Sequence, residues 1–490
     1  MSNGRRPLLL AAALALFGVL ATANAGGYRY GVSDQAFYIP ALALEAHPDL
    51  FPRDRSLLAP QMRLWPGAGT LEAASTAFGG DPSTGFLVLY VLTLALLGMG
   101  GLLLVRALGG SWWAAGSVLA LLTLRHRIAK TGANSLEGYM HPRMLAFAIG
   151  VCACAALVRN RWGLAVGLVF AAAWIHPTTG AWFGAMLVLA AIWQVRSRAV
   201  LGAAIAAGVT ATVGIAALAA SGRLVRMDPA WLGVLEGKDY LFPAEWPAYA
   251  WLANLAYPLL ILLLHRARRR RGLTTTGEDA VVAGALGLAA GFLLSVPLAE
   301  MRVAFVVQLQ VNRVFWLLDV LVAAYVAWWF ADVLARRRPA LVLGLLVLAA
   351  AARGTYILAV EARRPLVQVR MAPGAWRDAM AWLSAQPAAW QVLADPGHAW
   401  KFGTSVRVAA LRDTVLESGK DSAMAMYDRD VAMRVADRTR ALADFDTMSA
   451  ADVRRLDAAY GVDVFVDRAD RSWTFPVLYR NPDFVIYDLR

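Results

Sequence analysis

The dominant pattern along the chain is a series of long apolar runs separated by short polar connections. About 20 apolar residues are needed for a helix to cross a bilayer, and several of these runs are shorter, which indicates broken or half-buried helices around a cavity. The pattern predicts eleven crossings, at residues 7–21, 86–107, 111–124, 144–158, 162–175, 179–195, 199–220, 250–264, 280–298, 303–333 and 339–358.

The first apolar run has two interpretations. Arg5 and Arg6, the apolar run and the small residues Ala23-Asn24-Ala25 are typical of a cleaved signal peptide as well as of a first membrane helix. We favour a retained helix, and either interpretation leaves the chain from Tyr28 onward outside the cytoplasm. The polar loop that follows, residues 26–84, is too long for a simple connector, and loops of this kind often carry function.

The last segment, residues 359–490, contains no apolar run of membrane length and predicts a separate soluble domain. Its pattern alternates between helical and strand periodicity, which indicates a small α/β fold. We expect helices at 376–386, 421–443 and 449–459 and strands at 392–394, 462–466 and 484–487. The predicted division is therefore a polytopic membrane domain, residues 1–358, followed by an α/β domain, residues 359–490.

Composition and charge support a membrane protein and give it an orientation. Of 490 residues 59% are hydrophobic and only 17% charged, which excludes an ordinary soluble enzyme, a disordered protein and a fibrous one. The net charge of +13 does not form a patch for nucleic acid, because the arginines punctuate alternate connections. Fifteen arginines fall on the side of the N-terminus, so the positive-inside rule predicts a cytoplasmic N-terminus and an extracytoplasmic 359–490 in a bacterial inner membrane.

Two acids in the first outer loop are candidates for chemistry. Asp34 follows the first apolar run among aromatic residues, where partial desolvation would suit a base or a cation ligand, although Asp34 could equally cap the next helix. Asp54 lies between Arg53 and Arg55, which favours a local surface ion pair over contact with a substrate.

The second outer connection is unexpectedly basic. Arg125 and Arg127, together with His126 and Lys130, lie on the side where positive charge should be scarce. Snorkelling to lipid phosphates is one explanation, and binding the phosphate of a lipid-linked substrate is the other. The candidates that follow, before a helix expected to begin at a proline, are Glu137, His141 and Arg143.

Further polar groups interrupt other apolar runs. His176 ends a short span before Pro177, at a depth where a histidine is costly unless it is used or hydrogen-bonded. Arg302, Gln310 and Arg313 fall near one stripe if the segment is a continuous helix, which would make a polar cavity wall.

Motifs for nucleotide or structural-metal binding are not found in the sequence. It has no Walker-type phosphate loop, no dinucleotide-binding glycine pattern, no Gly-x-Ser-x-Gly elbow and no zinc-like Cys/His spacing, which argues against nucleotide-driven pumping. Cys152 and Cys154 point in different directions on a helix and are expected to be packing residues. Metal binding stays open, because lone carboxylates hold Mg²⁺ or Mn²⁺ only with substrate phosphates completing the shell.

The arrangement resembles the polytopic C-type membrane glycosyltransferases (GT-C). The likeness rests on an acid just after the first helix (Asp34), short broken spans, an outward basic cluster, and the tail segments Trp376 to Leu383, Tyr460 to Val466 and Phe484 to Tyr487. The paired acids common in that family are absent, since Gln35 follows Asp34. The stretch from Glu137 to Arg143 also looks like parts of other bacterial multi-pass proteins.

The resemblance implies transfer of a sugar from a polyprenyl phosphate to a glycan, lipid or protein acceptor at the outer membrane face. Asp34 is then the base or acceptor anchor, the arginines Arg125, Arg127, Arg143 and Arg302 would contact the lipid phosphate in the same site, and Mg²⁺ or Mn²⁺ could assist. A transporter or lipid flippase is the alternative, because buried polar groups also mark translocation paths. A non-enzymatic envelope protein would leave those groups unexplained.

Overall fold

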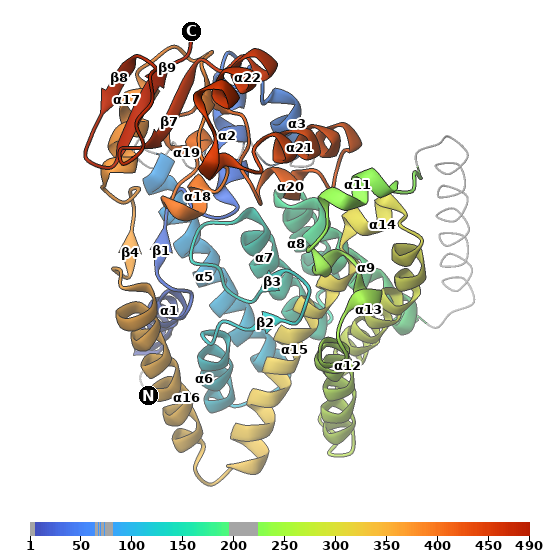
Figure 1. The fold of residues 1–490 in the computed structure, drawn as a ribbon. Coiled ribbons are helices and arrows are strands. Elements are labelled where there is room, and N and C mark those ends of the chain that lie inside the picture. Colours follow the sequence, from blue (N-terminus) through green and yellow to red (C-terminus); the bar gives the residue numbers. More distant parts are fainter. Residues whose placement is uncertain (1–4, 64–66, 68, 70–72, 74–81, 196–223) are drawn as a thin grey trace. The chain divides into compact units, whose positions relative to one another are not determined.

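The structure, a computed structural model, describes residues 5–63, 67, 69, 73, 82–195 and 224–490. It divides into two compact units, each assembled from three segments of the chain (Figure 1). Unit 1 comprises Met1–Tyr28, Leu87–Arg226 and Lys238–Val367, and unit 2 comprises Arg29–Phe86, Met227–Gly237 and Gln368–Arg490. The first outer loop thus belongs to the same compact unit as the C-terminal segment, whereas the expected division at residue 358 left it with the membrane domain.

Unit 1 consists mainly of apolar helices. Among the described residues, six helical segments are long and apolar enough to cross a membrane, and three shorter apolar helices accompany them. The chain is therefore a helical membrane protein, and the number of eleven crossings stays a prediction, as does the span at 199–220, which lies outside the described residues. The helices are α1 (Arg5–Asn24), α5 (Pro82–Ala107), α6 (Trp112–Leu122), α7 (Pro142–Val158), α8 (Trp162–Ile175), α9 (Pro177–Val195), α12 (Ala248–Arg269), α13 (Thr276–Glu300), α14 (Ala304–Leu309), α15 (Val314–Trp328) and α16 (Pro339–Tyr356).

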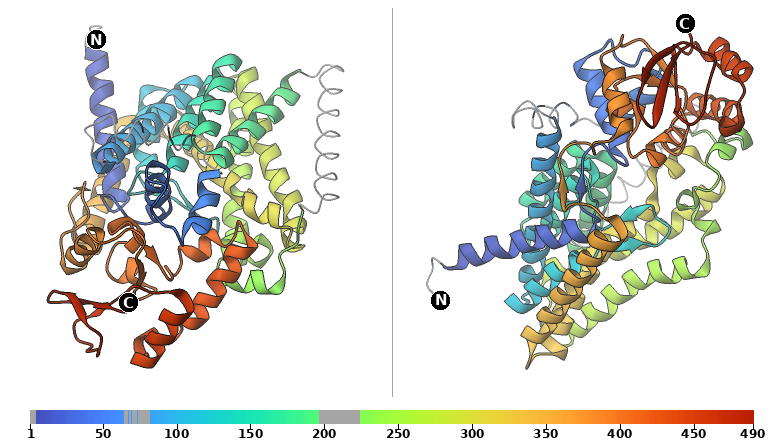
Figure 2. Two further views of the ribbon diagram at one scale, coloured as in Figure 1. Left: turned by 90° about the horizontal axis from the view of Figure 1, so that it is seen from above. Right: turned by 60° about the vertical axis from the view of Figure 1, so that its left-hand side comes forward.

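Close packing of these helices depends on small residues. Helices α7, α8, α9 and α13 lie side by side (Figure 2). A Cβ on Gly150 would come within 2.1 Å of the ring of Phe183, and a Cβ on Gly284 would meet the backbone of Met186 at 2.5 Å, so α9 can approach both neighbours only because glycine stands there. Helix α1 packs on α16, where Nδ2 of Asn24 donates to the carbonyl of Ala350 over 2.9 Å.

The predicted span at 303–333 is interrupted near its start. Arg302 precedes α14 with φ 57°, and Gln310 ends α14 with φ 49°, both in the left-handed region. A short 3₁₀ turn, Val311–Arg313, leads into α15. The expectation that Arg302, Gln310 and Arg313 share one helical stripe was wrong, because two left-handed residues break the helix on which that spacing depended.

Unit 2 contains a five-stranded sheet with the order β6-β5-β7-β9-β8. β5 is parallel to both β6 and β7, and β9 is antiparallel to β7 and β8. The strands are β5 (Gln391–Leu393), β6 (Asp413–Thr414), β7 (Val464–Arg468), β8 (Val477–Arg480) and β9 (Phe484–Asp488), and the two-residue strands elsewhere are β1 (Tyr28–Arg29), β2 (Arg127–Ile128), β3 (Ala133–Asn134) and β4 (Val367–Gln368). The predicted C-terminal strands are confirmed within a few residues.

One predicted helix packs on this sheet. Trp376 of α17 packs its ring against Phe484 of β9, with ring centroids 5.1 Å apart, and joins a buried core with Val392 and Val464. The expected helix at Trp376 is therefore confirmed and lies on the sheet. The single helix expected at 421–443 was wrong, because α20 (Asp421–Met424) ends before a turn and α21 (Arg429–Ala441) begins again with Asp428 as its N-cap. The helices of unit 2 are α2 (Gln35–Ala46), α3 (Arg55–Arg63), α11 (Pro229–Val234), α17 (Ala375–Ser384), α18 (His398–Lys401), α19 (Val406–Ala409), α20 (Asp421–Met424), α21 (Arg429–Ala441) and α22 (Ala450–Tyr460).

Candidate functional site

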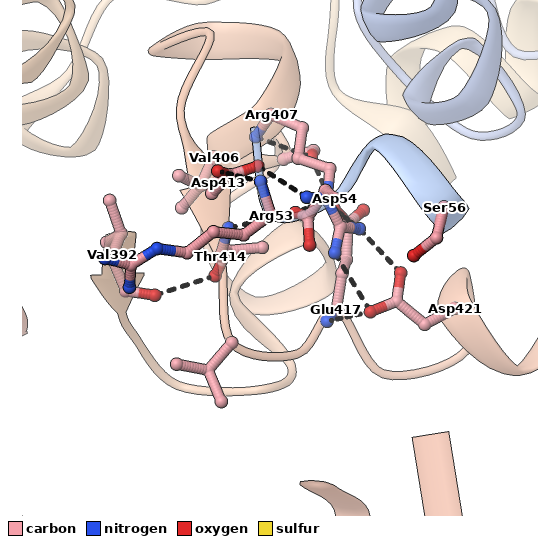
Figure 3. Close-up of polar contacts among 12 residues, drawn as sticks. Arg53, Asp54, Ser56, Val392, Val406, Arg407, Asp413, Thr414, Glu417 and Asp421 are labelled. Carbon is pink, nitrogen blue, oxygen red and sulfur yellow. Dashed lines mark hydrogen bonds and ion pairs between the residues drawn. The ribbon is translucent and has the colours of Figure 1, made fainter. Parts of the chain in front are cut away.

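A buried ion-pair network joins the first loop to the C-terminal segment inside unit 2 (Figure 3). Asp54 is fully buried, and its Oδ2 accepts from Nε of Arg407 over 2.7 Å. Arg434 donates to the other oxygen of Asp54. Arg407 in turn makes a bidentate pair with Asp421, at 2.6 and 3.0 Å. The surface ion pair expected for Asp54 was therefore wrong: its partners stand more than 350 residues away along the chain, where the local sequence cannot reveal them.

This network shifts the pKa values of its acids in different directions. Burial alone would raise the pKa of Asp54, but Arg407 and Arg434 outweigh it and hold the pKa below its ordinary value. Burial and the neighbouring charge of Asp54 raise the pKa of Asp413 to about 6. Burial raises the pKa of Glu417 to about 7 against the opposing effect of Arg407. The network thus holds Asp54 ionised and disfavours ionisation of Asp413 and Glu417.

Asp34 lies in the same unit, at the N-terminal end of α2. Its backbone occupies the cap position, but its side chain makes no capping hydrogen bond, so the capping interpretation was wrong. Instead Oδ1 of Asp34 accepts from Nζ of Lys420 over 3.0 Å, and the Asp34 side chain is 32% exposed. The carboxylate is therefore accessible to a ligand and has an ammonium beside it.

A cavity of about 260 Å³ adjoins this pair, lined among others by Ser33, Trp400, Glu417 and Lys420. We call it the Glu417 pocket. It lies wholly within unit 2, since its remaining walls come from residues 29–36 and 399–405. The pocket places hydroxyl, carboxyl and ammonium groups next to an aromatic ring, close to the acid predicted for catalysis.

A second polar group, the Glu137 cluster, lies in unit 1 around the start of α7. Glu137 and Arg143 form a buried ion pair at 3.2 Å, and Arg125 approaches the other oxygen of Glu137 at 4.0 Å. The ring centroid of His141 lies 6.4 Å from that of His176, and Arg143 and Arg313 are near enough to His176 to act on its charge. The structure thus brings together six of the predicted residues: Arg125, Glu137, His141, Arg143, His176 and Arg313.

The local sequence explains how two of these histidines are held. His141 is the N-cap of α7, with Pro142 in the first turn as predicted, and its Nδ1 accepts from the backbone N–H of Arg143 over 3.1 Å. His176 ends α8 directly before Pro177, and its Nδ1 accepts from the backbone N–H of Thr179 over 3.3 Å. Both rings are fixed by neighbouring backbone groups.

The other basic residues of this connection are mostly paired with acids from distant parts of unit 1. His126 contacts Asp319 at 2.9 Å, and Lys130 pairs with Asp239. Arg127 is exposed on β2. Sequence reasoning overlooked Asp319, although a lone acid within the apolar run of α15 is itself a signal of a buried polar contact.

Arg302 has partners of its own near the start of α14. The guanidinium of Arg302 pairs with Glu245 at 2.8 Å and lies 4.3 Å from the ring centroid of Phe242. Gln310 is buried at the break between α14 and η3 (Val311–Arg313). Asp34 belongs to unit 2 and the predicted phosphate contacts Arg125, Arg127, Arg143 and Arg302 to unit 1, so their joining in one site stays a prediction. Within the described residues, no group of three or more His, Cys, Asp or Glu side chains is arranged to hold a metal ion.

Sequence reasoning also missed Glu417, Lys420 and Trp400. Glu417 and Lys420 fall between the strand expected at 392–394 and the helix expected at 421–443, in a stretch for which no element was predicted. Trp400 is 81% exposed on a four-residue helix. An isolated tryptophan in a polar stretch outside the apolar runs is the one signal that could have drawn attention to this region.

In comparisons with known proteins, the chain is similar to solved structures in backbone fold only. No protein-family model and no curated protein matches the chain. Among solved structures, it is similar to the oligosaccharyltransferase of Archaeoglobus fulgidus with a tethered acceptor peptide, at 12% identity and TM-score 0.47 over 94% of this chain and 69% of that one. The oligosaccharyltransferase AglB of the same archaeon, in complex with an inhibitory peptide and a dolichol-phosphate, gives 12% identity and TM-score 0.49 over 94% and 70%.

Proposed function

We propose that the protein is an integral membrane glycosyltransferase that uses a polyprenyl-phosphate-linked sugar at the outer face of the cytoplasmic membrane. The observation that carries the proposal is the grouping of arginines in the Glu137 cluster. Arg143 pairs with Glu137 at 3.2 Å, and Arg125 approaches the same carboxylate at 4.0 Å. Guanidinium groups gathered beside apolar helices are suited to an anionic ligand, because charged groups at such positions usually serve a function.

The chemistry of that anion follows from its surroundings. Residues of the cluster lie in the connection from α6 to α7, in the first turn of α7 and at the end of α8, and all three helices are apolar, so a ligand reaching the cluster from the bilayer would carry an apolar tail. Arginine binds phosphate through parallel N–H bonds, and the phosphate of a polyprenyl carrier combines such a head with such a tail. The cluster would therefore hold the donor's phosphate and stabilise it as the leaving group.

Asp34 supplies the second half of the proposed reaction. The hydroxyl oxygen of the acceptor attacks the anomeric carbon, the bond from that carbon to the phosphate oxygen breaks, and polyprenyl phosphate departs. The hydroxyl proton passes to the Asp34 carboxylate, which is accessible and makes no capping bond. If Asp34 anchors the acceptor instead, it accepts the hydroxyl hydrogen bond without taking the proton, and the proton passes to the departing phosphate.

Transfer of labelled sugar in liposomes containing the full chain tests the proposal. The donors are polyprenyl-phosphate hexoses and pentoses, and the acceptors are extracted envelope glycans, lipids and proteins. We expect Asp34→Asn and Arg143→Gln to lower transfer at least about 10²-fold, the effect typical of losing a catalytic base or a donor to a developing charge. Asp49→Asn, an exposed acid of the same loop, is the matched control and should retain wild-type transfer.

Two results would overturn the proposal. One is the absence of transfer from every polyprenyl-phosphate sugar by folded wild-type protein; movement of the carrier between leaflets without its consumption would then identify a flippase. The other is wild-type transfer by both variants. Arg143→Lys separates a structural loss from a chemical one, because it keeps the charge that pairs with Glu137 while removing bidentate phosphate binding.

A further inference from the structure

One residue of the Glu417 pocket has a buried polar atom without a hydrogen-bond partner among the described residues. Oε2 of Glu417 accepts a hydrogen bond from the hydroxyl of Ser405 and lies 3.5 Å from Nη1 of Arg407. Oε1 of Glu417 is buried and makes no hydrogen bond with any described residue. A buried carboxyl oxygen without a partner is costly, and Glu417 is among the residues that line the cavity. The Glu417 side chain is fully buried, so a polar group of a ligand reaches Oε1 after a small local shift.

His398 is not a hydrogen-bond partner of the Glu417 carboxyl group. Its Nε2 accepts from the backbone N–H of Val406 over 3.2 Å, and its Nδ1 donates to the carbonyl of Asp395 over 2.7 Å. Nε2 lies 4.0 Å from Oε2 of Glu417 and, as an acceptor, carries no proton to give it. Burial lowers the pKa of His398 to about 4, in agreement with a neutral ring.

The cavity also has an apolar wall, the indole of Trp400. This side chain is 81% exposed, the highest value among the large apolar side chains of the described residues. The backbone that carries it is held at the start of α18, where the N–H of Gly397 donates to Asp395 over 2.7 Å. Because an indole has only two side-chain torsions, an exposed tryptophan is a contact surface that costs little conformational entropy on binding.

Groups that can donate hydrogen bonds line the rest of the cavity. Arg29 and Lys420 line it with cationic groups, and Ser33 and Thr404 line it with hydroxyls. Asp34 already balances Lys420, so the rim is not dominated by unpaired positive charge. A volume of about 260 Å³ is below the range of about 300–1,000 Å³ that accommodates drug-sized ligands, which limits the occupant to a single ring.

We propose that the Glu417 pocket binds one pyranose ring of a neutral glycan, which serves as the acceptor of the transfer reaction. The apolar face of a pyranose packs on Trp400, and its hydroxyls bond to Oε1 of Glu417 and to the donors around it. An acceptor peptide would need extended backbone contacts, which a cavity for one ring does not provide. The role of the ring as acceptor rests on the proposed function. The binding of the ring to the pocket does not depend on it.

Saccharide binding to the full chain, with no lipid donor present, tests the pocket alone. The protein is purified in a detergent without a sugar headgroup, and the probes are methyl hexopyranosides, a methyl pentopyranoside and a serine-containing tripeptide. Saturation-transfer NMR and tryptophan fluorescence report binding. We expect at least one methyl glycoside to bind and to change the fluorescence, and the tripeptide not to compete with it.

Substitution of Trp400 locates that binding. Trp400→Ala should weaken the affinity at least about tenfold and remove the fluorescence change, while Trp400→Phe should retain most of the affinity because it keeps an aromatic face. The matched control is Trp112→Ala, at an indole that is also highly exposed but belongs to unit 1, and it should bind like the wild type. Trp400 is so exposed that its replacement leaves the fold intact.

The proposal is overturned if no methyl glycoside binds to the wild type, if the tripeptide binds in preference, or if Trp400→Ala binds as well as the wild type. These failures are distinguishable from failure of the proposed function. Glycoside binding that depends on Trp400, without any sugar transfer, would support the sugar-binding pocket and contradict the transferase function. Sugar transfer without such binding would contradict the pocket and support the transferase function.

Discussion

Replacing Asp54 with asparagine should destabilise unit 2 without touching the proposed chemistry directly. The substitution preserves shape but removes the charge that faces Arg407 and Arg434 in a site where Asp54 is fully buried. Breaking one partner of a buried ion pair typically costs about 3–5 kcal/mol, because the remaining charge is left without compensation. Arg407 keeps its bidentate pair with Asp421, so we expect the lower end, about 3 kcal/mol.

Thermal unfolding of the purified full chain measures this cost. For a unit of this size, about 1 kcal/mol shifts Tm by roughly 2–4 °C, so Asp54→Asn should lower the transition of unit 2 by about 6–12 °C. Tryptophan fluorescence follows the transition, because Trp376 and Trp390 belong to the core around the sheet. The matched control is Asp470→Asn, whose ion pair with Arg468 is more than half exposed on both sides and should contribute less than about 1 kcal/mol.

The reasoning is refuted if Asp54→Asn melts at the same temperature as Asp470→Asn. A substrate-binding role for Asp54, which stays a prediction, would give a different result. The KM for the donor or acceptor would then rise while the melting temperature remained that of the wild type. A lowered Tm with unchanged KM identifies Asp54 as a structural link between the first loop and the C-terminal segment.

Two further predictions concern pH and topology. Because the pKa of Glu417 is raised to about 7 in the folded protein, the stability it contributes is fully present below its unfolded value of about 4.5 and is lost as pH rises through 7. Glu417→Gln should therefore raise the free energy of unfolding relative to the wild type by up to about 3 kcal/mol at pH 8, with a corresponding rise in Tm, but not at pH 5. An equal effect at both pH values would contradict the shift. Alkaline phosphatase should be active when fused after Arg490 and inactive when fused after Arg271, since the arginine-rich connections are predicted to be cytoplasmic. The reverse pattern would contradict the predicted topology.

The apolar runs and the C-terminal elements could be predicted because their signals are local. Pro142 and Pro177 mark the starts of α7 and α9 in the sequence, and the strand pattern at Val464 matches β7. The break at Gln310 could not be foreseen, since its left-handed backbone is set by packing rather than by residue type.

The candidate sites were predictable in part for the same reason. Glu137 and Arg143 are close along the chain, so their pairing follows from a short connection. The partners of Asp34 and Asp54 stand hundreds of residues away, at Lys420 and Arg407, and no local pattern links them. For Asp54, flanking arginines suggested the wrong partners, because local charge spacing says nothing about burial.

Release of the lipid carrier in a single turnover tests the central claim most directly. Protein in excess over a labelled polyprenyl-phosphate sugar is mixed with acceptor, and free polyprenyl phosphate and glycosylated acceptor are counted together. We predict equal amounts of the two products for the wild type, and for Asp34→Asn a bound donor that is released at least about 10²-fold more slowly. Equal rates for both proteins would contradict the role of Asp34, and an intact donor after incubation with the wild type would contradict the transferase itself.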